Sequence, residues 1–549
     1  MNKLKTTFTF LLTILFLLIP QTAQAAEDFN DIPQSHWAYS QVMKLKELGV
    51  TAGVGNNNFG TGQTITRAEF VTFLSNLMQW KSESGSGDYL DNTDKSKWYS
   101  ASVTNAYSRN LTGGEKSHFR PGDNITREEM AVMLINSLGL DYLADRFSAQ
   151  KSVFSDVTGN AGYISIAKDL GIISGMSQTT FGPAQTATRE QAAAMMVRMY
   201  NLLQNKTDEL NGFYAIRSAN QMGAVASLDT LSFGWCALET DGAKVWLNTT
   251  ASGGNEYNIP AGFEQPWNMA AGKNRLLMIA VKDEYSSLVI NNPALRAEAE
   301  KAIASILQNG LGEEKIFFDG IVLDFETLKG GESRNSYNAF VKQLRSSIGT
   351  EKLIYIAVHP ARYNQQYYDG YDFKVLGEQA DKIILMAHDY NPKSLTPEEM
   401  AMGLTATPIA PIDGVYEALK AITDENTGVQ DRGRVMLQIS FSSCQWKVQD
   451  SGIINSKPYT PDYSAIMNRI NSDPNAEVKY SNVHQSPYLT FYNEEDSTNN
   501  IVWYENEQSV AEKMRLALLF GINDFSFWRI GTIPDYNTAN LNVYGAVLK

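Results

Sequence analysis

The octapeptide Asp319-Gly-Ile-Val-Leu-Asp-Phe-Glu326 (DGIVLDFE) is an apolar strand that ends in two carboxylates. Because side chains alternate along a strand, Val322, Asp324 and Glu326 share one face. At about 3.3 Å per residue, the two carboxylates lie roughly 6–7 Å apart along the strand. Neighbouring buried acids lose hydration and repel each other, so stability does not explain them. The spacing predicts one ionised and one protonated carboxyl near neutral pH, which suits acid-assisted bond cleavage.

Seven further runs rich in apolar residues accompany this strand between residues 210 and 549. Amphipathic helical segments separate several of them, and eight such alternations predict an α/β fold, the (β/α)8 TIM barrel. Residues 447–507 exceed what a barrel needs and predict an inserted subdomain after strand seven. Catalytic residues of such barrels lie at the C-terminal strand ends, where Asp324 and Glu326 are expected. The eight expected strands are 213–218, 228–235, 275–281, 320–326, 353–359, 382–390, 435–441 and 524–530.

The first 200 residues contain three similar units, each with a turn followed by a Thr-Arg-Glu-type helix start. An aspartate and an aromatic residue precede each turn. Units this short bury their apolar faces against one another, which predicts a helix-rich bundle of three repeats. The three signatures are Thr66–Glu69, Thr126–Glu129 and Thr188–Gln191, and the preceding pairs are Asp31 with Trp37, Asp91 with Trp98, and Asp156 with Tyr163.

This pattern resembles the S-layer homology domain triplet, with repeats at 27–82, 88–145 and 152–204. The resemblance implies anchoring to a pyruvylated secondary cell wall polysaccharide on a Gram-positive-type surface. Each arginine could present its planar fork to a carboxylate. The alternative is structural, because Thr followed three residues later by Glu or Gln is also a helix capping box. The expected wall-polysaccharide contacts are Arg67, Arg127, Arg189, Asp31, Asp91, Asp156, Trp37 and Trp98.

The barrel region resembles glycoside hydrolase family 18, which contains chitinases and endo-N-acetylglucosaminidases. DGIVLDFE is similar to the family's DxxDxDxE signature, with Val322 in place of the middle Asp. Met386–Asp389 is similar to the M-x-Y-D motif, with His388 in place of Tyr. Phe527-Trp528 resembles the tryptophan of the barrel floor, and Val502-Trp-Tyr504 with Ser509 and Lys513 resembles the lead into the last helix. The Phe within DFE is closer to the spore-associated, peptidoglycan-directed branch.

The resemblance implies substrate-assisted hydrolysis, an exception to the usual scheme with a carboxylate nucleophile. Glu326 would protonate the leaving oxygen, and Asp324 would orient the substrate's 2-acetamido group as it attacks the anomeric carbon. Asp389 would hold this group or tune Glu326. The expected sugar contacts are Trp528, His388, Tyr390, Trp235 and Trp446. No cofactor or metal is expected.

Two other functions remain open at this point. A non-catalytic, chitinase-like carbohydrate-binding barrel has the same fold but typically lacks the catalytic Glu, and Glu326 is present here. A structural S-layer component would not require an intact acid pair. The expected substrates are glycans with β-linked N-acetylglucosamine, namely chitin, peptidoglycan or the N-glycan core.

The N-terminus and the charge predict an exported chain. Lys3 and Lys5 precede the apolar run FTFLLTILFLLI and the small residues Ala23-Gln-Ala25, so residues 1–25 are expected to be a secretory signal peptide. No later run is long enough for a membrane span. The net charge of −14 argues against a nucleic-acid partner. Cys236 and Cys444 are expected to be free, buried thiols, although their pairing is open.

Overall fold

A computed structural model describes residues 28–81, 87–114, 116–312, 315–363, 366–537 and 541–548. The expected signal peptide lies outside these residues. Within them, no helix has both the length and the apolar character needed to cross a membrane. Cys236 and Cys444 are both free and buried, as the sequence predicts.

The repeat region is helical, and each signature begins a helix. Thr66 forms a capping box with Glu69, and Thr188 and Gln191 exchange the corresponding bonds, so the capping prediction is confirmed at both positions. The helices are α1 (Tyr39–Glu47), α2 (Arg67–Leu77), α3 (Ser100–Ser108), α4 (Arg127–Ser137), α5 (Asp141–Phe147), α6 (Ala161–Asp169) and α7 (Arg189–Leu203).

Each signature arginine reaches the turn of another repeat. Arg67 Nε donates to the Phe119 carbonyl at 2.6 Å, and Arg127 Nε donates to the Phe181 carbonyl at 2.9 Å. Arg189 Nε donates to the Phe59 carbonyl at 2.9 Å. Each guanidinium also lies over the ring of the phenylalanine that it contacts. The arginines therefore link neighbouring repeats.

Eight parallel strands close into a barrel, which confirms the predicted fold class. They neighbour one another in the order β1, β16, β10, β9, β6, β5, β4, β2, and β1 also pairs with β2. Each of the eight expected runs overlaps one of these strands, and five of the runs contain their strand completely. They are β1 (Leu210–Tyr214), β2 (Thr230–Thr240), β4 (Asn274–Val281), β5 (Gly320–Phe325), β6 (Leu353–Val358), β9 (Lys382–Leu385), β10 (Val435–Ser440) and β16 (Asp524–Trp528).

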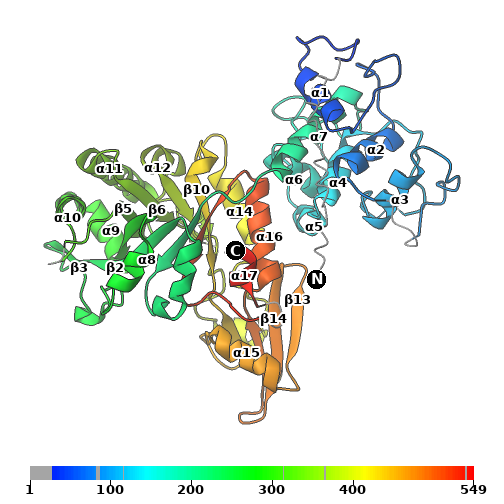
Figure 1. The fold of residues 1–549 in the computed structure, drawn as a ribbon. Helices are drawn as coiled ribbons and strands as arrows, with labels where there is room; N and C mark the ends of the chain where they lie inside the picture. Colours follow the sequence, from blue (N-terminus) through cyan, green and yellow to red (C-terminus); the bar gives the residue numbers. More distant parts are fainter. Residues whose placement is uncertain are drawn as a thin grey trace, which may run out of the picture. The chain divides into compact units, whose positions relative to one another are not determined.

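Helices connect the strands and lie outside them (Figure 1). Two of them follow β4, because Asn292 caps a second helix that starts with a proline. The helices of this part are α8 (Glu264–Met269), α9 (Asp283–Asn291), α10 (Pro293–Asn309), α11 (Gly330–Ile348), α12 (Phe373–Gln379), α13 (Pro397–Ala401), α14 (Ile412–Ile422), α16 (Glu507–Leu519) and α17 (Val543–Val547). Strand β3 (Val245–Asn248) pairs antiparallel with β2, and β7 (Arg362–Tyr363) pairs with β8 (Gln366–Tyr367).

A five-stranded antiparallel sheet separates β10 from β16 in the chain, where the sequence predicts an insertion. Its strands have the order β12, β11, β15, β14, β13. A core that includes Trp446 and Trp503 stabilises it. The elements are β11 (Cys444–Gln449), β12 (Gly452–Ile453), α15 (Tyr463–Ser472), β13 (Glu477–Ser481), β14 (Ser486–Asn493) and β15 (Thr498–Trp503).

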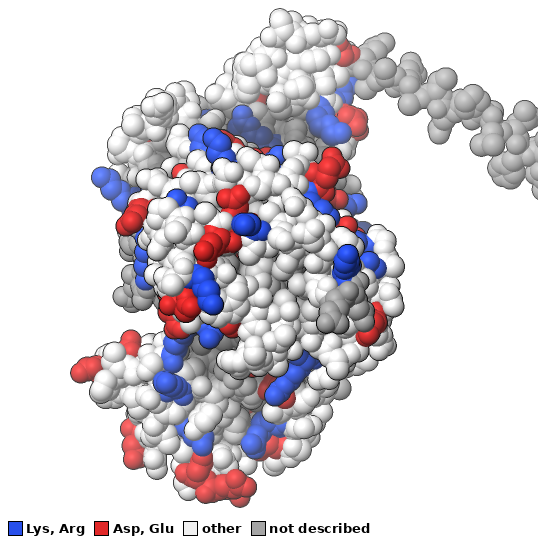
Figure 2. Space-filling model, turned by 90° about the vertical axis from the view of Figure 1, so that its left-hand side faces the viewer, with Lys and Arg blue, Asp and Glu red and all other residues white. Residues whose placement is uncertain are grey.

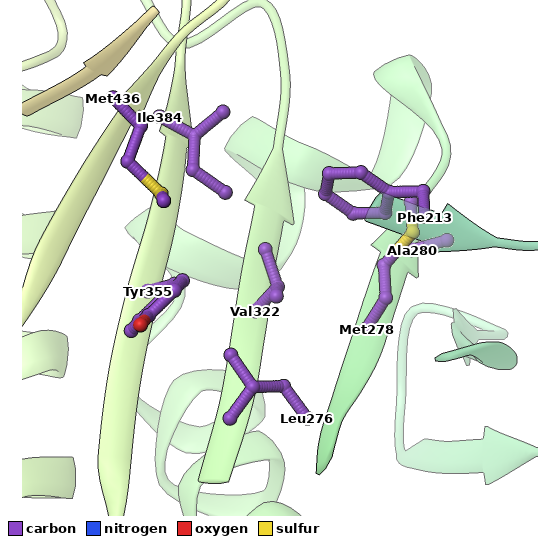
Figure 3. Close-up of a cluster of buried hydrophobic side chains, with 8 residues drawn as sticks. All are labelled: Phe213, Leu276, Met278, Ala280, Val322, Tyr355, Ile384 and Met436. Carbon is purple, nitrogen blue, oxygen red and sulfur yellow. The ribbon is translucent and has the colours of Figure 1, made fainter. Parts of the chain in front are cut away.

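The middle of the barrel interior is apolar (Figure 3). Val322 points inward from β5 towards side chains of the neighbouring strands and is fully buried. Trp528 packs against this cluster from the C-terminal end of β16. The cluster contains Phe213, Leu276, Met278, Ala280, Val322, Tyr355, Ile384 and Met436. It forms the apolar layer below Asp324 and Glu326.

Candidate active site

The parallel register brings ionisable side chains together at the C-terminal strand ends. Asp324 is level with Ala280 of β4, and Val322 is level with Tyr355 of β6. Glu326 and His359 directly follow β5 and β6, and this register brings His359 Nε2 to 3.3 Å from Glu326 Oε2. A cleft at this end is lined by Asp283, Glu326, Thr327, Lys329, His359, Tyr368, Tyr390 and Lys393. Loop residues 404, 406–408 and 411 and His484 of the insertion form another wall of the cleft.

Asp324 follows Val322 of the apolar interior cluster on the same face of β5. Burial raises the pKa of its carboxyl well above the usual range, and the charges of Glu326 and Asp283 raise it further. Its Oδ1 atom has no hydrogen-bond partner among the described residues. Burial and both neighbouring charges therefore favour the protonated form of Asp324.

Glu326 is more open, with its side chain 36% exposed. Burial alone would raise its pKa, but the bond from His359 and the charges of His359, His388 and Lys393 outweigh this effect and lower it. His359 Nε2 lies 3.3 Å from Glu326 Oε2. The surroundings thus shift the pKa values of the two acids in opposite directions, upward for Asp324 and downward for Glu326.

Asp389 and His388 form an ion pair beside the acids. His388 Nδ1 lies 3.0 Å from Asp389 Oδ2, and its Nε2 lies 2.7 Å from Gln438 Oε1. Burial would lower the pKa of His388, but Asp389 outweighs it and the pKa is raised. The backbone of Asp389 has a φ of 58°, a left-handed conformation that Asp tolerates better than most residues. Ser440 Oγ lies 3.5 Å from Asp389 Oδ1 and supports this orientation.

Trp528 lines a second cavity of about 800 Å³ at the same end of the barrel. Its ring meets Phe213 edge to face at 5.2 Å. Arg217, Arg529, Phe441 and residues 460–464 of the insertion also line this cavity. Trp528 therefore lines an open cavity at the C-terminal end of the barrel, as a sugar platform must. Tyr390 lines the first cleft, and its hydroxyl donates to the Gly414 carbonyl at 3.1 Å.

Two predicted sugar contacts are wrong. Trp235 is 1% exposed, and it packs against Phe233 and Phe263. Trp235 lies within the register shift of β2 between Phe233 and Cys236, and its ring also contacts Tyr214. Trp446 is fully buried in the core of the insertion, and its indole N–H donates to Thr407. Neither ring can stack on a glycan.

Sequence reasoning missed three residues that act on the acid pair. His359 contacts Glu326 directly. Partial burial and the charge of Glu326 raise the pKa of Asp283, which follows β4. Burial and the charges of Asp324 and Glu326 raise the pKa of Tyr257, which packs against the interior cluster. The sequence signal that could have identified His359 is its position directly after β6, because Glu326 directly follows β5 in the same way.

The aspartates and arginines of the repeats are engaged within the protein. Asp31 accepts the N–H groups of residues 59–61, and Asp91 and Asp156 accept those of the corresponding turns. The arginines are 2–5% exposed, so the expectation that they present an open fork to a wall carboxylate is corrected. Trp37 and Trp98 are 58% and 64% exposed, and are the expected contacts that the structure places on the surface.

Comparisons with known proteins found matches for both the repeat region and the barrel region. Residues 28–71, 91–131 and 153–193 match the S-layer homology domain. Over 183 residues the chain is 32% identical to amylopullulanase of Thermoanaerobacterium thermosulfurigenes, covering 32% of this chain and 9% of that protein. Over 257 residues it is 22% identical to the cortical fragment-lytic enzyme of Bacillus subtilis, covering 46% and 54%. The chain thus spans at most about half the length of these two relatives.

Among solved structures, the spore cortex-lytic enzyme SleL of Bacillus cereus is similar, with a TM-score of 0.47 and 18% identity. That match covers 62% of this chain and 74% of SleL. The model for glycosyl hydrolases family 18 matches residues 217–532, which is more than half of the chain and contains both acids, Asp389 and Trp528. The chain therefore belongs to glycosyl hydrolases family 18 and carries an S-layer homology triplet on the N-terminal side of that domain.

Proposed function

We propose that this chain is a cell-surface glycosidase that hydrolyses glycans with β-linked N-acetylglucosamine through the substrate's own 2-acetamido group. The observation that carries the proposal is the acid pair of Asp324 and Glu326, with a strongly raised pKa on the buried member. Asp389 follows β9, which is separated from β5 by β6, and Trp528 lines a cavity at the same end of the barrel. The family membership and the cell-wall enzymes among the relatives support this class of substrate.

In the proposed reaction, substrate binding moves one proton within the acid pair. The acetamide N–H approaches Asp324 and favours its ionised form, as a hydrogen bond to a carboxylate does. The proton released by Asp324 is then taken up by Glu326. Glu326 gives this proton to the leaving oxygen as the acetamide oxygen bonds to the anomeric carbon. Asp324 stabilises the positive charge on the cyclised acetamide, and Glu326 then accepts a proton from the water that opens the ring.

The test is incubation of the full chain with chitooligosaccharides, peptidoglycan and a high-mannose glycopeptide, followed by mass spectrometry. We expect new reducing ends at N-acetylglucosamine with at least one substrate, and none with Glu326→Gln. Glycans with a free 2-amino group at the reacting sugar should not be cleaved. Binding of all three glycans without cleavage would instead support a carbohydrate-binding barrel. Cleavage of the amino sugar would exclude the acetamide as nucleophile.

We further propose that the repeats hold the enzyme on a wall polysaccharide. The exposed rings of Trp37 and Trp98 support this, because exposed aromatic side chains provide apolar faces for sugars. The full chain should sediment with purified cell walls, and the double variant Trp37→Ala/Trp98→Ala should sediment several-fold less. Removal of the pyruvyl groups from the walls tests carboxylate recognition separately, since equal sedimentation before and after removal would exclude it.

Charge does not favour another polymeric partner on the face shown in Figure 2. There, Lys and Arg are interspersed with Asp and Glu, and large uncharged areas lie between them. The net charge of −14 is consistent with this view. A basic field of the kind that binds phosphate backbones is absent from the described residues on this face.

A further inference from the structure

His359 occupies a defined place next to the proposed acid. It immediately follows β6, and its Nε2 atom lies 3.3 Å from Glu326 Oε2. The imidazole is held on its other side by Tyr368, whose ring centroid is 4.7 Å away. The residue is 8% exposed, whereas the Glu326 side chain is 36% exposed. The geometry thus places a fixed, buried donor against one oxygen of a more open carboxylate.

We propose that His359 is a positioning residue that orients the Glu326 carboxylate and sets the upper end of the pH range in which Glu326 can act as an acid. This inference rests on the proposed function, because it assumes that Glu326 protonates the leaving oxygen. It concerns a residue outside both signatures, DGIVLDFE and Met386–Asp389.

The direction of the effect follows from the sign of the interaction. A donor or a positive charge beside a carboxylate stabilises its ionised form. Loss of His359 therefore raises the pKa of Glu326, so the acid stays protonated to higher pH. The high-pH limb of kcat/KM then moves upward. At low pH the variant is slower, because the carboxyl has lost the contact that orients it towards the leaving oxygen.

Other charged groups also act on Glu326, and they remain in every variant. Asp324 lies on the same strand as Glu326, and Asp283 follows β4. His388 and Lys393 follow β9. A change confined to residue 359 therefore measures the contribution of the imidazole against a constant background.

The experiment compares two substitutions in the full chain. His359→Phe keeps the ring against Tyr368 but removes the donor and the charge, and His359→Gln keeps an N–H donor without a titrating group. Profiles of kcat and KM against pH are measured on the glycan that the wild type cleaves. For His359→Phe, we expect the high-pH limb of kcat/KM to move upward by about one pH unit. At the high-pH end, kcat/KM divided by its own maximum should then be roughly tenfold higher in the variant than in the wild type. His359→Gln should recover the orientation and hence much of kcat at low pH. The surface variant His118→Gln serves as the control.

A second measurement does not depend on turnover. NMR titration of the Glu326 carboxyl carbon in the wild type and in His359→Phe should show Glu326 losing its proton at higher pH in the variant, because the adjacent donor is gone. Unchanged titration of Glu326, or an unchanged high-pH limb in folded His359→Phe, would overturn the inference. If Glu326→Gln remains active, the proposed function fails instead. If Glu326→Gln is inactive and both His359 tests show no change, only this inference fails.

Discussion

The two ends of the barrel interior both contain clustered ionisable groups, but they are arranged differently. At the N-terminal end, Lys382 Nζ lies 2.5 Å from Asp524 and 3.3 Å from Glu209. Glu209 also accepts bonds from Thr230 and Tyr355. At the C-terminal end, Asp324 meets further carboxylates and has an oxygen without a hydrogen-bond partner among the described residues.

The charges at the N-terminal end compensate one another, as in a structural network, whereas those around Asp324 at the C-terminal end do not. Burial would lower the pKa of Lys382, but Asp524 and Glu209 outweigh it and keep the ammonium charged. At the other end, burial and neighbouring charges act in the same direction on Asp324. Opposite charges at hydrogen-bond distance compensate for lost hydration, whereas like charges do not. The uncompensated end is where chemistry is expected.

The strongest test of the comparison removes the proposed acid. Glu326→Gln should reduce kcat by roughly two to four decades, the usual contribution of a positioned proton donor. Glycan binding should persist, because the amide keeps the shape of the side chain and Trp528 is untouched. Steady-state kinetics together with isothermal titration of the variant measure both. A loss of less than tenfold would show that another group supplies the proton.

Substitution of the partner acid, Asp324, should reduce the rate less than substitution of Glu326, and it should stabilise the folded chain at high pH. Asp324→Asn should reduce kcat on the order of 10²-fold, because a neutral amide cannot stabilise the developing positive charge. Since the folded pKa of Asp324 is raised, the wild type loses stability as pH rises from the unfolded pKa towards the folded one. The amide removes that loss, so denaturant unfolding at pH 8 should find the variant more stable. If the variant and the wild type lost the same unfolding free energy between pH 4 and pH 8, Asp324 would not be the source of that loss.

The N-terminal end should respond in stability alone. Lys382→Met leaves Asp524 and Glu209 without their ammonium and should cost roughly 3 kcal/mol of unfolding free energy, as is typical when a buried ion pair loses one member. Activity per folded molecule should stay near the wild-type value. Urea unfolding and active-site-normalised kinetics check the two statements. A kcat loss comparable to that of Asp324→Asn would mean that the two ends are not independent.

The smallest expected effect comes from position 322. Val322→Asp places a third carboxyl below Asp324, and repulsion should hold the shared proton to higher pH. We expect the high-pH limb of kcat/KM to move upward by about one pH unit, so that kcat/KM divided by its own maximum rises about tenfold at the high-pH end. The pH profile of the variant is the measurement. An identical profile would show that residue 322 does not act on the pair.

Several predictions could be made from sequence because they depend on local patterns. The eight strands follow from apolar runs, and the acid pair from the two-residue period of β5. The capping boxes of the repeats follow from spacing along one helix. His359 and Tyr257 could not be assigned this way, because their contacts depend on register between strands or on a loop that folds over the barrel.

The predictions that failed depended on which way a side chain points. Trp235 lies at an irregularity of β2 and is buried against Phe233 and Phe263, and Trp446 belongs to the sheet of the insertion rather than to the barrel rim. The arginines of the repeats resemble surface ligands in the sequence, yet each is buried against a carbonyl that lies more than 50 residues away. Burial is set by residues distant in the chain, so residue type alone does not determine it.

The sequence by itself determined the barrel, the repeats and the two acids, because periodicity and motif spacing are properties of a single segment. The tertiary structure alone decided the direction in which the pKa of each acid is shifted, because that depends on the apolar layer below Asp324 and on the imidazole of His359 beside Glu326. A pKa responds to burial and to charges within a few ångströms, and both arise only when separate strands are brought together.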